Sequence, residues 1–235
     1  MAQSAAWPSW AWAPRVLLAG LLAGALWLPQ PAAPQSQNNP KPGTAAPEIS
    51  AVEAYRKGWD VYDDDHAEAM RLFRIAADQG SALAQSAIGG MYALGDGVPQ
   101  DDAEAARWYH KAAEQGDAKA EFNIHVSYDL GRGVPEDGPE AIRWLRKSAD
   151  QGYPDAQYIL ATYYRRGHRV AQDYTEMARW FRKAADQGYS VAQYEVGVMY
   201  EEGQGVARDL DQARAWMQKA AGQDDDRAKK WLAAH

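Results

Sequence analysis

The chain of 235 residues is 46% hydrophobic and 24% charged, which is ordinary for one globular domain with a tail. It carries 25 Lys and Arg against 32 Asp and Glu, a net charge of −7. This disfavours nucleic acid as a partner, because phosphate binding requires a basic surface. The chain has no cysteine, which excludes disulfides, thiolate metal sites, cysteine nucleophiles and lipid attachment at a cysteine.

The first segment, 1–28, is predicted to be a secretory signal peptide. Val16 to Leu28 is an uncharged apolar run of 13 residues, and Arg15 precedes it. A signal peptide has an apolar stretch of about 7–15 residues, whereas a membrane span needs about 20. The alternative is an uncleaved inner-membrane anchor with tryptophans at the interface, the one membrane contact that the sequence suggests. Either way we expect the folded part outside the cytoplasm, periplasmic or secreted.

Residues 29–47 are predicted to form a disordered linker. This stretch contains six prolines and no run of apolar residues that could bury a face. The leader and linker hold two basic residues and no acidic one, which leaves 23 basic and 32 acidic residues in 48–235. The remaining domain therefore carries a net charge of −9 and is more acidic than the whole chain.

From residue 48 onward the sequence repeats with a period of 36. Tryptophan, tyrosine and glycine columns recur in phase: Trp108, Trp144, Trp180, Trp216; Tyr92, Tyr128, Tyr164, Tyr200; Gly95, Gly131, Gly167, Gly203. The units are 48–80, 81–116, 117–152, 153–188 and 189–224, with a shorter end at 225–235. Because one unit cannot bury its own apolar face, stacked neighbours must do so. The pattern predicts an array of five repeats and a C-terminal cap.

Each unit is predicted to contain two helices. In the second unit Ala84, Ile88 and Met91 share one helical face, and Gly95 supplies a left-handed stop. A second helix then begins with Asp-x-x-Glu, as at Asp101, which we interpret as a variant capping box. The alanine columns permit close approach of helices, and the tryptophan column is interpreted as core.

These residues resemble the Sel-one-like repeat family, which is related to the tetratricopeptide repeats. The second unit matches the family pattern at Ala84, Gly89, Met91, Tyr92, Gly95, Gly97, Val98, Asp101, Ala105, Trp108, Tyr109, Lys111, Ala112, Ala113, Gln115 and Gly116. The resemblance covers 48–235. It implies an all-α, right-handed α/α solenoid of stacked helix-turn-helix repeats that serves as an adaptor for protein complexes.

Two positions depart from that pattern. His125 stands where other units have Gly89, Ala161 or Gly197, so looser helix packing is expected in the third unit. Arg169 replaces the second loop glycine. A cysteine-rich branch of the family includes members described as binding β-lactams. Its properties do not carry over to a chain without cysteine.

A search for catalytic patterns predicts that the chain is not an enzyme and holds no cofactor. The sequence contains no G-x-S-x-G, H-E-x-x-H, Walker or G-x-G-x-x-G pattern, and no serine is followed three residues later by lysine. The acidic run Asp63 to His66 is interpreted as a charged turn that caps a helix, and no metal site is predicted.

Columns that vary between units are free to carry specificity. In the first helix of each unit the variable positions are Ala87, Gly90, Leu94 and their equivalents, which form one stripe. The candidate partner-binding residues on it are Asn123, Val126, Ile159, Thr162, Arg166, Glu195 and Glu202. The stripe predicts a groove for a peptide or helix, apolar near the third unit and acidic near the fifth. The alternative is a solvated, partly packed face.

The favoured function is therefore a non-enzymatic scaffold at the cell envelope that binds a protein or peptide partner. The alternative is a sensor or hydrolase for cell-wall fragments or a β-lactam. That function needs a pocket with convergent polar groups, and the sequence shows no such group of residues.

Overall fold

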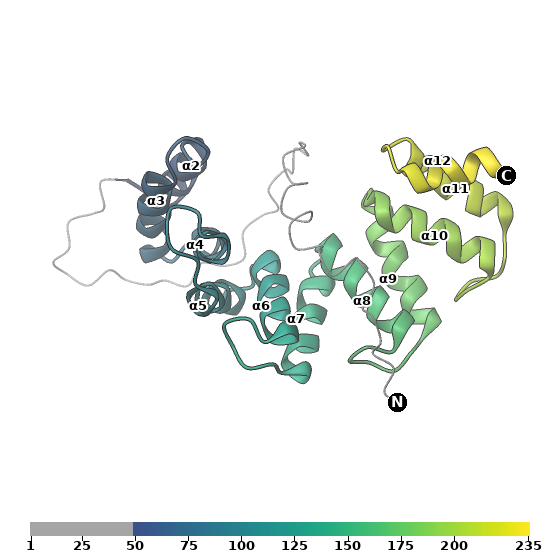
Figure 1. The fold of residues 1–235 in the computed structure, drawn as a ribbon, viewed down its shortest axis with the longest axis horizontal. Helices are drawn as coiled ribbons and strands as arrows, with labels where there is room; N and C mark the ends of the chain where they lie inside the picture. The colour runs from purple at the N-terminus through teal and green to yellow at the C-terminus, as the bar shows by residue number, and fades with distance from the viewer. Residues whose placement is uncertain (1–48) are drawn as a thin grey trace, which may run out of the picture. The chain divides into compact units, whose positions relative to one another are not determined.

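The computed structural model describes residues 49–235, so the predicted leader and linker lie outside the described residues. The described part forms eleven helices, shown in Figure 1: α2 (Ala51–Asp60), α3 (His66–Asp78), α4 (Ala82–Leu94), α5 (Asp102–Glu114), α6 (Ala118–Leu130), α7 (Gly138–Asp150), α8 (Pro154–Arg166), α9 (Tyr174–Asp186), α10 (Ser190–Glu202), α11 (Leu210–Ala221) and α12 (Asp226–Ala234). Among these helices, none has both the length and the apolar character needed to cross a membrane.

The helices are stacked in chain order. Each helix contacts the next one along the sequence, from α2 with α3 to α11 with α12. From α2 to α10, each even-numbered helix is the first helix of a repeat and forms a hairpin with the odd-numbered helix after it. Five hairpins followed by α12 result (Figure 1), which confirms the prediction of an all-α array of helix-turn-helix repeats.

Both helix ends are set by residues of the repeat pattern. The first helices α4, α6, α8 and α10 end at glycines whose φ lies between 64° and 78°: Gly95, Gly131, Gly167 and Gly203. The left-handed conformation costs glycine little, so these stops follow from the sequence. The second helices begin at an aspartate, and Asp101 Oδ1 accepts from the Glu104 backbone N–H at 3.0 Å. The predicted helix boundaries at these caps are confirmed.

The capping box, in contrast, is only half formed. The Asp101 backbone N–H donates to the Tyr92 carbonyl at 3.0 Å, and Asp137, Asp173 and Asp209 make the equivalent bond, whereas the Asp65 N–H donates to the Val61 carbonyl. Glu104 therefore has no amide left to accept from, and it pairs with Arg107 one turn along the helix instead. The glutamate of Asp-x-x-Glu serves an i,i+3 ion pair, and our expectation of a reciprocal box was wrong.

Alanine and tryptophan columns build the core. The alanine column is completely buried at 0% exposure: Ala84, Ala120, Ala156, Ala192 and Ala228. Trp144, Trp180 and Trp216 are 2–3% exposed, whereas Trp108 is half-buried. The interpretation of the tryptophan column as core is confirmed for three of the four full repeats.

Within a repeat, a small residue of the first helix accommodates a large one of the second. A Cβ added at Gly89 would lie 2.7 Å from the Tyr109 ring, and one added at Gly197 would lie 2.8 Å from Met217 Cε. Real Cβ atoms do not approach so closely, so glycine is required there by its neighbour.

In the third repeat His125 takes the glycine position without opening the core. The imidazole is 2% exposed, and its ring centroid lies 5.7 Å from that of Tyr163. Leu145, which is smaller than the equivalent Tyr109, is 0% exposed. The expectation of looser packing was wrong, because the larger first-helix residue is matched by a smaller second-helix residue.

Candidate functional site

The variable stripe forms a surface row on the first helices. We call the surface made by Ala87, Gly90, Leu94 and their equivalents in α6, α8 and α10 the first-helix face. Leu94 and Leu130 are 47% and 55% exposed. Arg166 and Glu202, at the equivalent positions of α8 and α10, are also exposed, while four other candidates are half-buried: Asn123, Val126, Ile159 and Thr162. Their role in partner binding stays a prediction.

Glu195 does not belong to an open acidic groove. It is 9% exposed, and its Oε2 lies 2.6 Å from Arg165 Nη1 on the preceding first helix. A carboxylate buried against a guanidinium contributes little negative charge to the surface. The expectation that Glu195 is free of packing was therefore wrong, and the face between α8 and α10 is less acidic than predicted.

Two arginines that the sequence analysis did not include among the candidates lie next to Glu195 and its neighbour Tyr194. The Arg165 guanidinium also covers the Phe181 ring at 5.3 Å. Arg227 on α12 lies 4.2 Å over the Tyr194 ring, and its Nη2 is 2.6 Å from Asp225 Oδ2. The signal that could have found this region is local charge: 153–188 holds six basic and four acidic residues, a positive balance within a domain of −9.

A second polar region arises where the repeat pattern is broken in the loop after α8. In the other repeats a loop glycine with positive φ packs on the start of the preceding second helix, and a Cβ at Gly133 would overlap the Asp102 carbonyl oxygen. Arg169 takes this position with φ 60°, and the preceding helix carries Gly138 where it would pack. A Cβ at Gly138 would lie 2.8 Å from Arg169 Nη1. At this junction the large side chain lies in the loop and the glycine lies on the second helix, which is the reverse of the other repeats.

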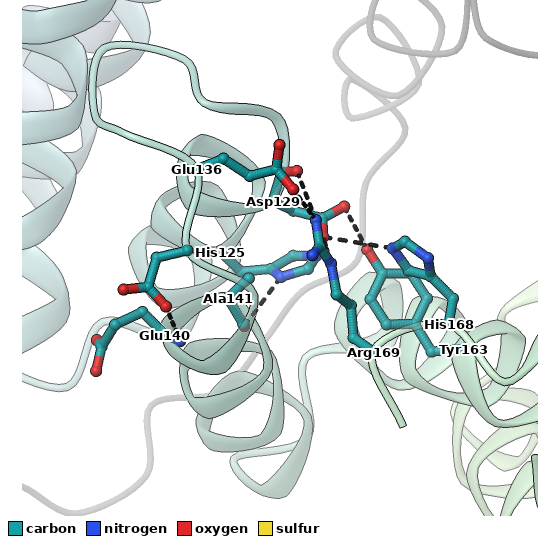
Figure 2. Close-up of polar contacts among 9 residues, drawn as sticks. His125, Asp129, Glu136, Glu140, Ala141, Tyr163, His168 and Arg169 are labelled. Carbon is teal, nitrogen blue, oxygen red and sulfur yellow. Dashed lines mark hydrogen bonds and ion pairs between the residues drawn. The ribbon is translucent and has the colours of Figure 1, made fainter. Parts of the chain in front are cut away.

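Arg169, in the fourth repeat, bonds to two carboxylates of the third repeat (Figure 2). Its Nε donates to Asp129 Oδ1 at 3.0 Å, and its Nη2 donates to Glu136 Oε1 at 2.5 Å. The Tyr163 hydroxyl donates to Asp129 Oδ2 at 2.7 Å, and His168 Nε2 lies 3.5 Å from Oδ1. Asp129 is thus held from two elements of the next repeat, α8 and the loop after it.

The electrostatics of this cluster favour fixed protonation states. Burial raises the pKa of Asp129, but hydrogen bonds from Tyr163 and Arg169 outweigh it and leave the pKa below its usual value. His125 Nδ1 lies 3.0 Å from the Ala141 carbonyl (Figure 2), and since a carbonyl only accepts, Nδ1 carries the hydrogen. Burial lowers the pKa of His125 to about 4, so its ring is neutral near pH 7.

This arrangement is suited to holding two repeats in register. The Asp129 carboxylate already accepts from an arginine and a tyrosine, so it is not available as a general base. Over residues 49–235, no group of three or more His, Cys, Asp or Glu side chains could hold a metal ion. Asp65, in the acidic run, accepts from the Glu68 backbone N–H at 3.0 Å, which confirms its interpretation as a helix cap. The first-helix face remains the candidate site.

Stacked hairpins with glycine-capped loops define an α-solenoid repeat protein. The family model of the Sel1 repeat matches the chain five times, at 50–81, 82–117, 120–153, 154–189 and 190–225. The chain belongs to the Sel1 repeat family. Among curated proteins, none matches it.

Solved structures agree with this assignment. A Sel1 repeat protein from Oxalobacter formigenes is 36% identical, with a TM-score of 0.74 over 78% of this chain and 55% of that one. A protective antigen of uropathogenic Escherichia coli with the SLR fold is 32% identical, with a TM-score of 0.72 over 77% of this chain and 40% of that one. The chain thus spans about half the length of these two proteins. An immunity protein from Pseudomonas aeruginosa, at 22% identity and a TM-score of 0.53 over 79% of this chain and 70% of that one, shares the fold.

Proposed function

We propose that the chain is a non-enzymatic scaffold that binds a protein or peptide partner on its first-helix face. The observation that carries this proposal is the row of exposed residues Leu94, Leu130, Arg166 and Glu202, which changes from leucine to arginine and then glutamate although the repeats pack alike. Leu94 and Leu130 are large apolar side chains exposed at equivalent positions of two successive first helices, where a partner could cover them. Members of the Sel1 repeat family generally mediate protein interactions, which supports the proposal.

The mechanism would be recognition by a preformed surface. The first helices are held in place by buried alanines and by capped ends, so the row exists before a partner arrives. Binding then costs little ordering of the scaffold, and the affinity depends on the contacts themselves. Variation along the row gives each repeat a different contribution to specificity.

We also propose that the repeat domain is exported to the cell envelope. Support comes from the sequence of 1–28, whose short apolar run has the length of a signal peptide. Mass spectrometry of the N-terminus of the protein purified from its native envelope tests this. A peptide beginning after residue 28 would support a cleaved signal, and an intact leader in the membrane fraction would support the anchor. Recovery of the uncleaved chain from the cytoplasm would overturn export.

The scaffold proposal is tested by affinity capture of the full-length chain from its native envelope. The informative variant is Leu130→Asp on α6, and the matched control is Leu210→Asp on α11, because these leucines are 55% and 48% exposed. A partner that is lost with Leu130→Asp and retained with Leu210→Asp supports the first-helix face. A partner indifferent to both, or turnover of a cell-wall fragment or β-lactam by the purified chain, would overturn it.

A further inference from the structure

Among the helices of residues 49–235, α4 is the one that contains no charged side chain. Leu83, Ala87, Gly90 and Leu94 share one side of this helix, and we call them the α4 row. Leu83 and Leu94 are 54% and 47% exposed, and the two small residues between them are half-buried. At 1.5 Å per residue the two leucines lie about 16 Å apart along the helix axis. The α4 row is therefore an uncharged, apolar surface about three turns long.

Within the described residues, no neighbour requires a glycine at position 90. A Cβ added at Gly90 would meet only the Tyr109 hydroxyl, at the ordinary contact distance of 3.8 Å, whereas one at Gly89 would lie 2.7 Å from the Tyr109 ring. The φ of Gly90 is not positive either, and a glycine inside a helix destabilises it relative to other residues. At the equivalent positions α6 and α10 carry Val126 and Val198. Gly90 thus leaves the α4 backbone open to close approach by another chain.

An exposed tryptophan on α2 lies beside the α4 row. Trp59 and Gly90 are equivalent, since each follows the serine that caps its helix by nine residues. Trp59 is 45% exposed, and its ring centroid lies 4.9 Å from that of Tyr62. The Tyr62 hydroxyl donates to Asp96 Oδ2 at 2.7 Å, two residues beyond the end of α4, so the tryptophan is held near that end. Tryptophan is the residue type most enriched among the side chains that dominate binding energy at interfaces.

Charged side chains flank the α4 row on both neighbouring first helices. Because α4 packs with α2 in one core cluster and with α6 in another, it lies between them (Figure 1). At positions equivalent to those of the row, α2 carries Arg56 and Asp63 and α6 carries Lys119, and all three are exposed. A ligand that lies along α4 meets an apolar surface beneath it and charges along both edges, which is complementary to an amphipathic helix. A charged residue within its apolar stripe would lose water without gaining a counter-charge from α4.

We propose that the α4 row docks an amphipathic helix of a partner protein, whose uncharged apolar stripe crosses α4 at Gly90 and packs against Trp59. This inference rests on the proposed scaffold function and names the chemistry of its partner. The axes of packed helices are about 8–10 Å apart, and the shorter separations need small residues at the contact. Ala87 and Gly90 supply these at the centre of the row, and Leu83 and Leu94 contact the partner helix at either end.

The test begins with random peptides of about 16 residues, between four and five helical turns, displayed on phage and selected against the full-length chain. We expect the selected peptides to repeat apolar residues at intervals of three and four, with no charged residue among them. A synthesised peptide is then titrated by fluorescence anisotropy. Gly90→Val gives α4 the residue of α6 and α10, and it should weaken binding at least about tenfold by blocking the close approach. Leu83→Lys gives α4 the equivalent residue of α6, and it should weaken binding as much, because the ammonium would be buried unpaired.

Thermal unfolding followed by circular dichroism separates an effect on binding from an effect on folding. Gly90→Val should not lower the melting temperature, because a Cβ fits at this position and valine is a better helix former than glycine. The control for Leu83→Lys is Leu210→Lys on α11. It changes a leucine of similar exposure, 48% against 54%, on a second helix and should leave the affinity unchanged.

Selected peptides with charges in the apolar stripe, a selection that yields no binding peptide, or equal affinity of Gly90→Val and the wild type would each overturn the inference. Self-association of the chain that vanishes in Leu83→Lys would overturn it in favour of a second copy. If envelope capture yields a partner that depends on Leu130 but binds Gly90→Val and Leu83→Lys as well as the wild type, the assignment to α4 fails and the scaffold function stands.

Discussion

Protonation of His125 should weaken the fold in mild acid. Burial depresses the pKa of this ring from 6.5 to about 4, and Asp129, His168 and Arg169 are the titratable groups that face it. The unfolded chain therefore binds more protons than the folded one between pH 4 and pH 6.5. The stabilising contribution of neutral His125 is complete above the unfolded pKa and is lost as the pH falls toward the folded one.

The size of the effect follows from the interval between the two pKa values. One pKa unit corresponds to about 1.4 kcal/mol. At about pH 5 the unfolded imidazole is mostly protonated and the folded one mostly neutral, which costs about 2 kcal/mol of unfolding free energy relative to pH 7.5. Below the folded pKa the loss levels off near 3 kcal/mol, about a quarter of the stability of many small domains.

Urea unfolding followed by circular dichroism at about pH 7.5 and pH 5 measures this loss. The comparison variant is His125→Asn, whose side-chain amide does not titrate and can still donate to the Ala141 carbonyl. Carboxylates elsewhere lose stability equally in both proteins, so the wild type should lose about 2 kcal/mol more than the variant over this interval. Equal losses in the two proteins would show that His125 is not held neutral by burial.

Further substitutions test the packing of loops and helices by thermal or urea unfolding. Gly133→Ala should destabilise the fold by about 3 kcal/mol or more, because its Cβ would overlap the Asp102 carbonyl. Gly131→Ala in the same loop should cost only about 1 kcal/mol, for its positive φ alone. Equal costs would contradict the close approach of Gly133 to the Asp102 backbone. Arg169→Gly should be about 1 kcal/mol more stable than Arg169→Ala. Both variants lose the same ion pairs, but only alanine keeps the strain of a positive φ at position 169. Identical stability of the two variants would argue against that strain. Gly89→Ala should cost about 1–3 kcal/mol by contact with the Tyr109 ring, and adding Tyr109→Leu should recover part of it; no recovery would refute the match of sizes.

The repeat architecture could be predicted because its determinants are local and recur. Glycine stops and aspartate caps act within a few residues of their own position, so a single unit displays them and the four full repeats confirm the phase. The tryptophan and alanine columns are read in the same way. The half-formed capping box could not be predicted in this way. The acceptor that competes for the Asp101 backbone N–H is the Tyr92 carbonyl, which lies in the preceding helix.

The surface was harder to predict because contacts between repeats join different columns. Arg165 bonds to Glu195 thirty residues later rather than thirty-six, so aligning equivalent positions does not bring the two together. Variation between units predicts freedom from packing, and this prediction is wrong at Glu195. At Glu195 the variation reflects a buried ion pair with Arg165, which within residues 49–235 has no counterpart at the equivalent positions of the other repeats.

The departures from the repeat pattern are concentrated at one junction, and they compensate for one another there. Arg169 can replace a loop glycine because Gly138 gives it room, and Asp129 then accepts its guanidinium. His125 can replace a helix glycine because the second helix offers Leu145 in place of a tyrosine or phenylalanine. In a stacked array each interface contributes separately to stability, so such exchanges can alter one interface without disturbing the others. The third and fourth repeats are therefore joined by polar contacts specific to them, while the surface they present remains free to diverge.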